Sequence, residues 1–334
     1  MNIVTQQSQS IVSFRNKGEE KFQNVRTRLK SLHERGLGVL LVKTRQIKTH
    51  PARDRTHTAS PFLFKILRTC ALFAIISPVL PISAGNNDPV GAKSAGIAHA
   101  SVTLADEWSS FNNQAGLGYI PKPTIGLYFE NRFQVKEFSL KAGTFAYPLK
   151  PATLALSYRH FGYSKYHESK VGLGIGRKFT EYFAVGVQID YLQTYFAEGY
   201  GTYNAVAAEA GLLAKPLKGL RIGFHVYNFT RNNNNSLPEE SIPTNVRLGI
   251  SYEIERKATI LLEAEKELES NVMIKAGLDL NPVNNLFFRL GFATQIEQYS
   301  VGIGYKLKRI SADIAFSHNA ILGFSPKAGI SFEF

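Results

Sequence analysis

From residue 124 to the end, the sequence repeats one pattern in which apolar residues alternate with small or polar ones. In TIGLYFEN, at 124–131, one face carries only Ile125, Leu127 and Phe129. The same period continues through the last segment, KAGISFEF, down to Phe334. A period of two residues is that of a β-strand, whose side chains point alternately to opposite faces. The pattern therefore predicts an all-β fold.

A soluble sandwich would show the same alternation, with its apolar face inside. Three features favour a membrane barrel instead: strands of about 9–12 residues, apolar faces that begin or end with Tyr or Phe, and an export signal. Tight links such as NPVNN alternate with longer polar ones such as RNNNNSLPEESIP. We therefore expect a 14-stranded antiparallel transmembrane β-barrel at 124–334, with both ends on the periplasmic side. The expected strands are 124–131, 137–147, 152–162, 168–178, 182–195, 202–214, 219–229, 244–254, 258–267, 271–281, 285–294, 298–307, 310–318 and 325–334.

The export signal lies at 63–84, and its residues 65–84 read KILRTCALFAIISPVLPISA. Lys65 and Arg68 precede an apolar run, and small residues up to Ala84 follow it, which is the three-part pattern of a secretory signal. Residues 1–62 form a basic leader that we expect to be disordered. It is either a targeting arm or the product of a misassigned start, with translation beginning near Leu63, and we favour the second. The predicted location is the outer membrane of a Gram-negative bacterium.

The net charge of +13 belongs mostly to this leader, since residues 1–60 carry 12 Lys and Arg against 4 Asp and Glu. From Gly85 onward the count is 25 against 22, which argues against a nucleic-acid partner. No G-x-S-x-G, H-E-x-x-H or Walker A motif occurs, so we predict no enzyme and no cofactor. The only cysteine, Cys70, lies within the signal.

Residues 85–123 break the alternation and are rich in small residues. Fourteen strands enclose a lumen too wide for side chains alone to fill. We therefore expect this segment to form a small N-terminal plug, or hatch, inside the lumen.

The run GAKSAGIAHASVTLADEWSSFNNQAGL at 91–117 resembles the N-terminal signature of FadL-like outer-membrane barrels, and especially the PorV/PorQ branch. Gln114 stands where that family usually has Pro. The resemblance implies a fourteen-stranded barrel with an N-terminal hatch. The residues to which we assign the plug motif are Gly91, Ala95, Gly96, Asp106, Trp108, Asn113, Gly116 and Leu117.

Two functions follow from this resemblance. The PorV/PorQ branch implies an accessory role in type IX secretion, with secretion-system proteins as partners. The alternative is a passive transporter of small hydrophobic molecules, with such a molecule as ligand. Outer-membrane lipid and the barrel assembly machinery are expected partners in both cases. Because the predicted loops are mostly short and polar, uptake of large lipids is disfavoured.

Two further expectations concern particular side chains. Phe334 would be the last lipid-facing residue of the closing strand, and a terminal aromatic residue there resembles the signal read by outer-membrane assembly machinery. Turn lengths place Glu263 opposite Lys275 and Glu265 opposite Arg247 on the lumen face. We expect these four residues to form an ion-pair network. The alternative is a cation site made by the carboxylates of LLEAEKELES.

Overall fold

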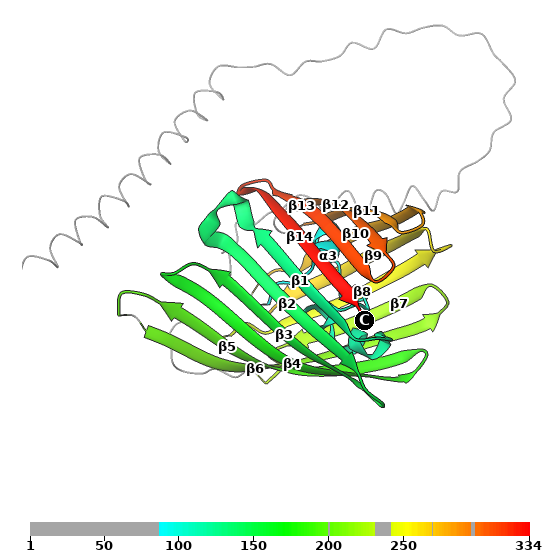
Figure 1. Cartoon of the computed structure of the whole chain (residues 1–334), viewed down its shortest axis with the longest axis horizontal. Helices are drawn as coiled ribbons and strands as arrows, with labels where there is room; N and C mark the ends of the chain where they lie inside the picture. Colours follow the sequence, from blue (N-terminus) through cyan, green and yellow to red (C-terminus); the bar gives the residue numbers. More distant parts are fainter. Residues whose placement is uncertain (1–86, 200, 231–241, 269, 295–297) are drawn as a thin grey trace, which may run out of the picture. The chain divides into compact units, whose positions relative to one another are not determined.

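The computed structural model describes residues 87–334 except for 200, 231–241, 269 and 295–297. The predicted leader at 1–62 and signal peptide at 63–84 lie outside these residues. In the described part, no helix has the length and apolar character needed to cross a membrane. The polypeptide instead forms fourteen antiparallel strands that close into a barrel, as predicted (Figure 1). The strands are β1 Thr124–Asn131, β2 Ser139–Pro148, β3 Thr153–Gly162, β4 Tyr166–Thr180, β5 Phe183–Phe196, β6 Gly201–Leu217, β7 Leu220–Tyr227, β8 Asn245–Ile254, β9 Ala258–Glu267, β10 Met273–Val283, β11 Leu286–Ala293, β12 Gln298–Leu307, β13 Ile310–Asn319 and β14 Gly323–Glu333.

The barrel closes because its first and last strands pair with each other. Each strand pairs with its neighbour in sequence, and β1 pairs with β14 from Thr124 opposite Glu333 to Glu130 opposite Lys327. Closure leaves no strand edge, which is the condition for a sheet to span a bilayer.

The side chains sort between the two faces as the alternation predicts. On β1, Leu127 is 57% exposed whereas the next residue, Tyr128, is 4% exposed. The same contrast runs along the other strands, where the exposed positions are mostly aliphatic or aromatic and many inward ones are Gly, Ala, Ser or charged. An outer surface of this kind suits lipid, whereas the inward residues face a filled lumen.

The two ends of the barrel have different connections. Turns of two to four residues join the strands at the end where β1 begins and β14 stops. The links at the opposite end include the long segment between Tyr227 and Asn245 and the short 3-10 helices η2 Arg132–Gln134 and η3 Lys136–Phe138. Short turns mark the periplasmic end of bacterial outer-membrane barrels, and we use that orientation throughout.

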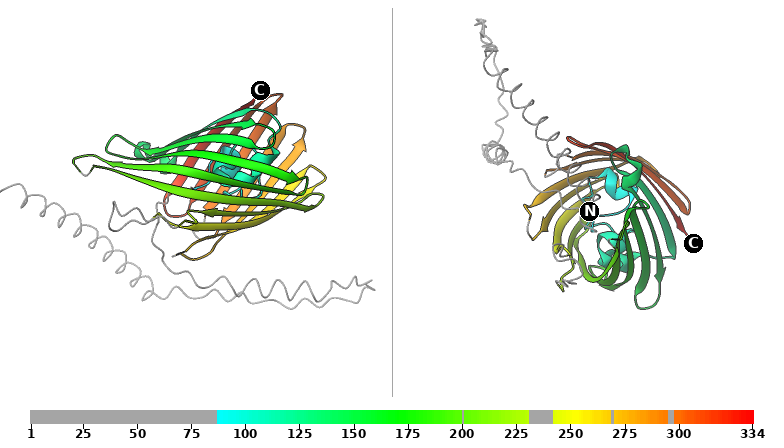
Figure 2. Two further views of the ribbon diagram at one scale, coloured as in Figure 1. Left: turned by 90° about the horizontal axis from the view of Figure 1, so that it is seen from below. Right: turned by 90° about the vertical axis from the view of Figure 1, so that its left-hand side faces the viewer.

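Inside the ring of strands lies the plug, residues 87–123, as expected for this segment (Figure 2). Its short elements are helix α3, Ala92–Gly96, helix α4, Ser109–Asn112, and the 3-10 helix η1, Gln114–Tyr119. Helix α3 packs against β11–β14, whereas η1 packs against β3–β6. The plug therefore contacts opposite arcs of the wall.

The last residue extends the ladder by one backbone hydrogen bond. The Phe334 N–H donates to the Pro123 carbonyl at 2.9 Å, and the ring lies edge-on to Phe332 with centroids 5.0 Å apart. About half of the Phe334 side chain is exposed on the outer surface. Its role as an assembly signal stays a prediction.

We expect Phe334→Asp to lower the amount of heat-modifiable barrel in the outer-membrane fraction, because it puts a charge on the lipid face of the closing strand. Phe334→Leu is the control, since it keeps the position apolar. Normal membrane levels of the Asp variant would refute the assembly role.

Candidate functional site

The backbone of the plug lies directly against the barrel wall, and inward glycines make this approach possible. At three wall positions a Cβ atom would come within 2.2 or 2.3 Å of a plug backbone atom; these are Gly186, Gly223 and Gly291. Real Cβ atoms do not approach other atoms so closely, so a side chain there would move the plug. The glycines of the alternating pattern therefore mark the path of the plug along the wall.

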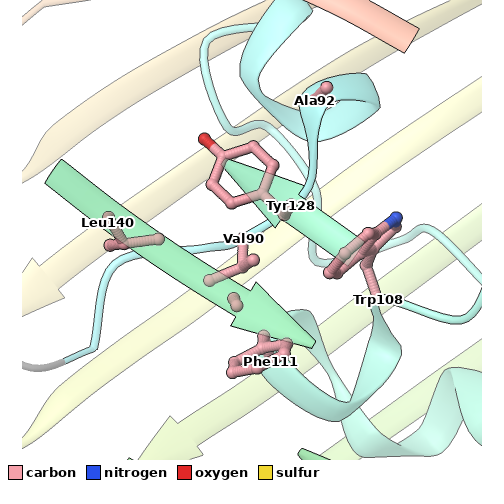
Figure 3. Packing of buried hydrophobic residues seen from close by; sticks show 7 residues of the cluster. Val90, Ala92, Trp108, Phe111, Tyr128 and Leu140 are labelled. Atoms are coloured by element: carbon pink, nitrogen blue, oxygen red, sulfur yellow. The ribbon is translucent and has the colours of Figure 1, made fainter. Parts of the chain in front are cut away.

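One part of the contact is apolar and centres on Trp108 (Figure 3). Trp108 is 4% exposed and packs with Val90 and Phe111 of the plug and with Tyr128 and Leu140 of the wall. The Trp108 and Tyr128 rings meet edge to face, with centroids 5.9 Å apart. Burial of this indole ties the plug to β1 and β2.

Two glycines of the plug motif are required by the geometry. Gly91 has φ 112°, which favours glycine, and the Trp108 ring lies 2.8 Å from where a Cβ would be. At Gly116 a Cβ would lie 2.3 Å from Ser109 Oγ and 2.8 Å from the Leu104 carbonyl oxygen. Glycine at both positions therefore allows plug segments to pack closely against each other.

The polar residues of the motif join plug segments to each other and, through Asn113, to the wall. The Asn113 side-chain amide donates to the carbonyls of Val102, at 2.7 Å, and Leu212, at 3.1 Å. Asp106 accepts from the Trp108 N–H at 3.1 Å and pairs with Lys93 at 3.2 Å. The remaining members are buried, Ala95 and Gly96 in α3 and Leu117 in η1. The structure thus brings all eight motif residues into the plug.

Gln114, which departs from the family pattern, makes the most direct contact with a charged wall residue. Its amide donates to Glu209 Oε2 at 2.5 Å. Glu209 also accepts from Lys170 at 2.6 Å and lies 2.9 Å from His225 Nε2. All four side chains are buried. Neither Glu209 nor Lys170 was predicted from the sequence as a site residue, and no local pattern indicates that Glu209 joins Lys170 to Gln114.

The expected acidic and basic residues of β9 and β10 meet as the register predicted. Glu263 lies opposite Lys275, and the Lys275 ammonium contacts Glu263 at 3.3 Å and also Glu265. The pair also binds the plug, because Glu263 accepts from the Val102 N–H at 2.8 Å and Lys275 donates to the His99 carbonyl at 3.4 Å.

Arg247 faces Glu265 across the β8–β9 pair, but its guanidinium has other contacts. It donates to His225 Nδ1 at 2.9 Å and to the Phe111 carbonyl at 3.5 Å. Arg247 therefore connects the Glu209 group to the plug. The assignment of all four residues to one network stays a prediction.

Further ion pairs continue around the inner wall. Arg289 pairs with Asp313 at 2.6 Å and Asp279 at 3.3 Å, and Lys327 pairs with Glu130 at 3.6 Å. We call these inward-facing charged residues, together with the Glu209 and Lys275 groups, the charged ring. Among the described residues, no three His, Cys, Asp or Glu side chains are grouped so that they could hold a metal ion.

We expect Glu263→Gln and Lys275→Met each to lower the free energy of unfolding, because each leaves a buried charge without its partner. The double variant should lose less than the sum, by about 1–3 kcal/mol, in denaturant titrations followed by gel mobility. The exposed pair Lys178 and Glu181, 2.8 Å apart, is the control and should show a much weaker coupling, because solvent screens the two charges. Additive effects, or strong stabilisation by calcium, would support the cation site instead.

Gly186→Leu should displace the plug, because its first side-chain atom would already collide with the backbone at Gln114. We expect the barrel to form and its ion conductance in planar bilayers to rise. Gly143→Leu is a matched control, since a Cβ there meets only ordinary contacts at 3.6 Å or more. Equal conductance in both variants would mean that this contact does not hold the plug in the lumen.

No protein-family model and no curated protein sequence matches the chain. Solved structures of similar fold do match. A FadL homologue from Pseudomonas aeruginosa has a TM-score of 0.52 at 13% identity, over 75% of this chain and 97% of that one. The toluene transporter TodX of Pseudomonas putida gives 0.54 at 11%, and CymD, a monoaromatic hydrocarbon channel, gives 0.55 at 12%, each over 75% of this chain and 99% of its own. The chain therefore has the fold of the FadL-like outer-membrane barrels.

Proposed function

We propose that the protein is a passive outer-membrane transporter of small hydrophobic molecules. The observation that carries this proposal is a set of apolar and aromatic residues on the inward face of β4–β7. The set begins beside Lys170 and Glu209 of the charged ring and continues towards the extracellular end. Leu192, Ala205, Ala207 and Tyr227 form one cluster there, with Ile242 packed against it. Leu192, Ala207 and Tyr227 are packed, so the half-buried outer part of the set is the surface that would take an apolar solute out of water.

Aromatic rings continue this lining towards the mouth. Tyr166 and Phe196 lie with ring centroids 5.0 Å apart, and Phe196 and Tyr203 lie 6.0 Å apart. All three residues are inward on strands that run beyond the apolar outer belt, and all are half-buried. A small aromatic or aliphatic solute can pack against the faces and edges of these rings.

The plug supplies the gate in this proposal. Part of it is held by hydrogen bonds with the charged ring, in which the Val102 N–H donates to Glu263 and the His99 carbonyl accepts from Lys275. Such contacts can be exchanged for water at modest net cost, unlike the apolar contacts around Trp108. Passage then needs no chemical energy, only displacement of the polar side of the plug.

The solved structures of similar fold support transport rather than secretion or catalysis. TodX is described as a toluene transporter and CymD as a monoaromatic hydrocarbon channel. At 11–12% identity this likeness concerns the fold, so the solute class is our proposal. The expected PorV/PorQ role in type IX secretion gains no support from the plug, the wall or these structures. The same likeness and the apolar outer belt support an outer-membrane location.

The experiment is uptake of radiolabelled toluene by cells of a Gram-negative host that lacks its own hydrocarbon channels. Expression of the full chain should raise the initial rate of uptake severalfold, whereas uptake of glucose should not change. Phe196→Ser with Tyr203→Ser should lower toluene uptake, because it removes the aromatic lining.

Tyr195→Ser is the matched control, since Tyr195 lies on the same hairpin but stacks with His167, 4.8 Å away, on the outer face. Toluene uptake equal to that of cells without the protein would refute the proposal. A loss of uptake in the Tyr195 variant equal to that in the Phe196 and Tyr203 variant would refute the role of the lining.

A further inference from the structure

The periplasmic turns carry an excess of positive charge that the extracellular links do not share. The six turns at 149–152, 181–182, 218–219, 255–257, 284–285 and 308–309 hold six Lys and Arg residues against two Glu. The seven links at the other end hold four Lys and Arg against six Glu, although they contain many more residues. The charge is therefore concentrated at one end of the barrel.

Among the described residues, Lys150, Lys218 and Lys308 form no ion pair, whereas Arg309 lies close enough to act electrostatically on Glu333. Acids near the turns already have other partners: Glu181 pairs with Lys178, Glu253 with Arg221 and Glu333 with Lys122. The turn cations are also exposed. Their charge is thus directed outwards and not used within the fold.

Three of these cations directly follow a lipid-facing residue in sequence. Leu149, Leu217 and Leu307 are 50–67% exposed, and the next residue in each case is a lysine. Two residues before Leu149 and Leu307 stand Tyr147 and Tyr305, also exposed. Tyrosine, then leucine, then lysine along a strand is the order expected from the bilayer interface to the phosphate level.

We infer that this basic rim binds the phosphate groups of anionic phospholipids in the periplasmic leaflet. The lipid is favoured over an acidic protein because cations stand at the ends of lipid-facing strands in four of the six turns, and Glu181 and Tyr182 form a turn without one. The turn at Asn284–Asn285 carries no charge. A ring of such contacts would surround the barrel with anionic lipid and fix its depth in the membrane. The inference rests on the membrane-spanning arrangement proposed above.

The test uses the full chain in nanodiscs made from equal amounts of phosphatidylglycerol and phosphatidylcholine. Lipids retained after detergent extraction are counted by native mass spectrometry. Phosphatidylglycerol should be enriched, and Lys218→Gln with Lys308→Gln and Arg309→Gln should lower this enrichment by about tenfold or more. Raising the salt concentration should weaken it in the unmodified chain.

The control removes three exposed cations from the opposite end, Lys136→Gln, Lys141→Gln and Lys165→Gln, and should keep the enrichment. Equal retention of both lipids, or equal losses in both triple variants, would overturn the inference. Binding of polyglutamate to the rim without lipid enrichment would also overturn the inference and would favour an acidic protein as the partner. A barrel that enters nanodiscs and takes up toluene without lipid preference would leave the transport proposal standing. Failure to enter bilayers would refute both.

Discussion

The pairing of β1 with β14 is the constraint on which the rest of the structure depends. In lipid every backbone N–H and C=O group needs a partner within the protein, and this pairing removes the last two edges of the sheet. Once the ladder is closed, alternation sends one half of the side chains to the lipid and the other half into a single lumen. Glycines and charges from strands far apart in sequence therefore converge on the plug.

The strand number and the two faces could be predicted because both depend on a local period of two residues. The limits of β4, β5 and β6 were harder: β4 and β6 are each four residues longer in total than predicted, and β5 is shifted by one residue. Their extensions include Tyr166 and Phe196, beyond the part of the wall whose outer face is aliphatic. Where no lipid covers the outer face, that face need not be apolar. The alternation of apolar and polar residues that predicts a strand therefore weakens.

The candidate site could be predicted only where it follows from turn lengths. Counting from the turns placed Glu263 opposite Lys275, and the strands pair in that register. Neither the bond between Gln114 and Glu209 nor the contact of Arg247 with His225 follows from any local pattern. Both depend on the path of the plug through the lumen. The inward glycines were a sequence signal of that path, since a residue without a side chain on a charged face indicates a close neighbour.

The plug contacts two separate arcs of the wall, and this arrangement has a consequence for the assembly of the barrel. Helix α3 rests on β11–β14, the last strands to be synthesised, whereas η1 rests on β3–β6. The plug precedes every strand in the chain, yet half of its binding surface does not exist until the chain is complete. The final strand then joins the first around a segment that is already present. The step that closes the cylinder is thus also the step that encloses the plug.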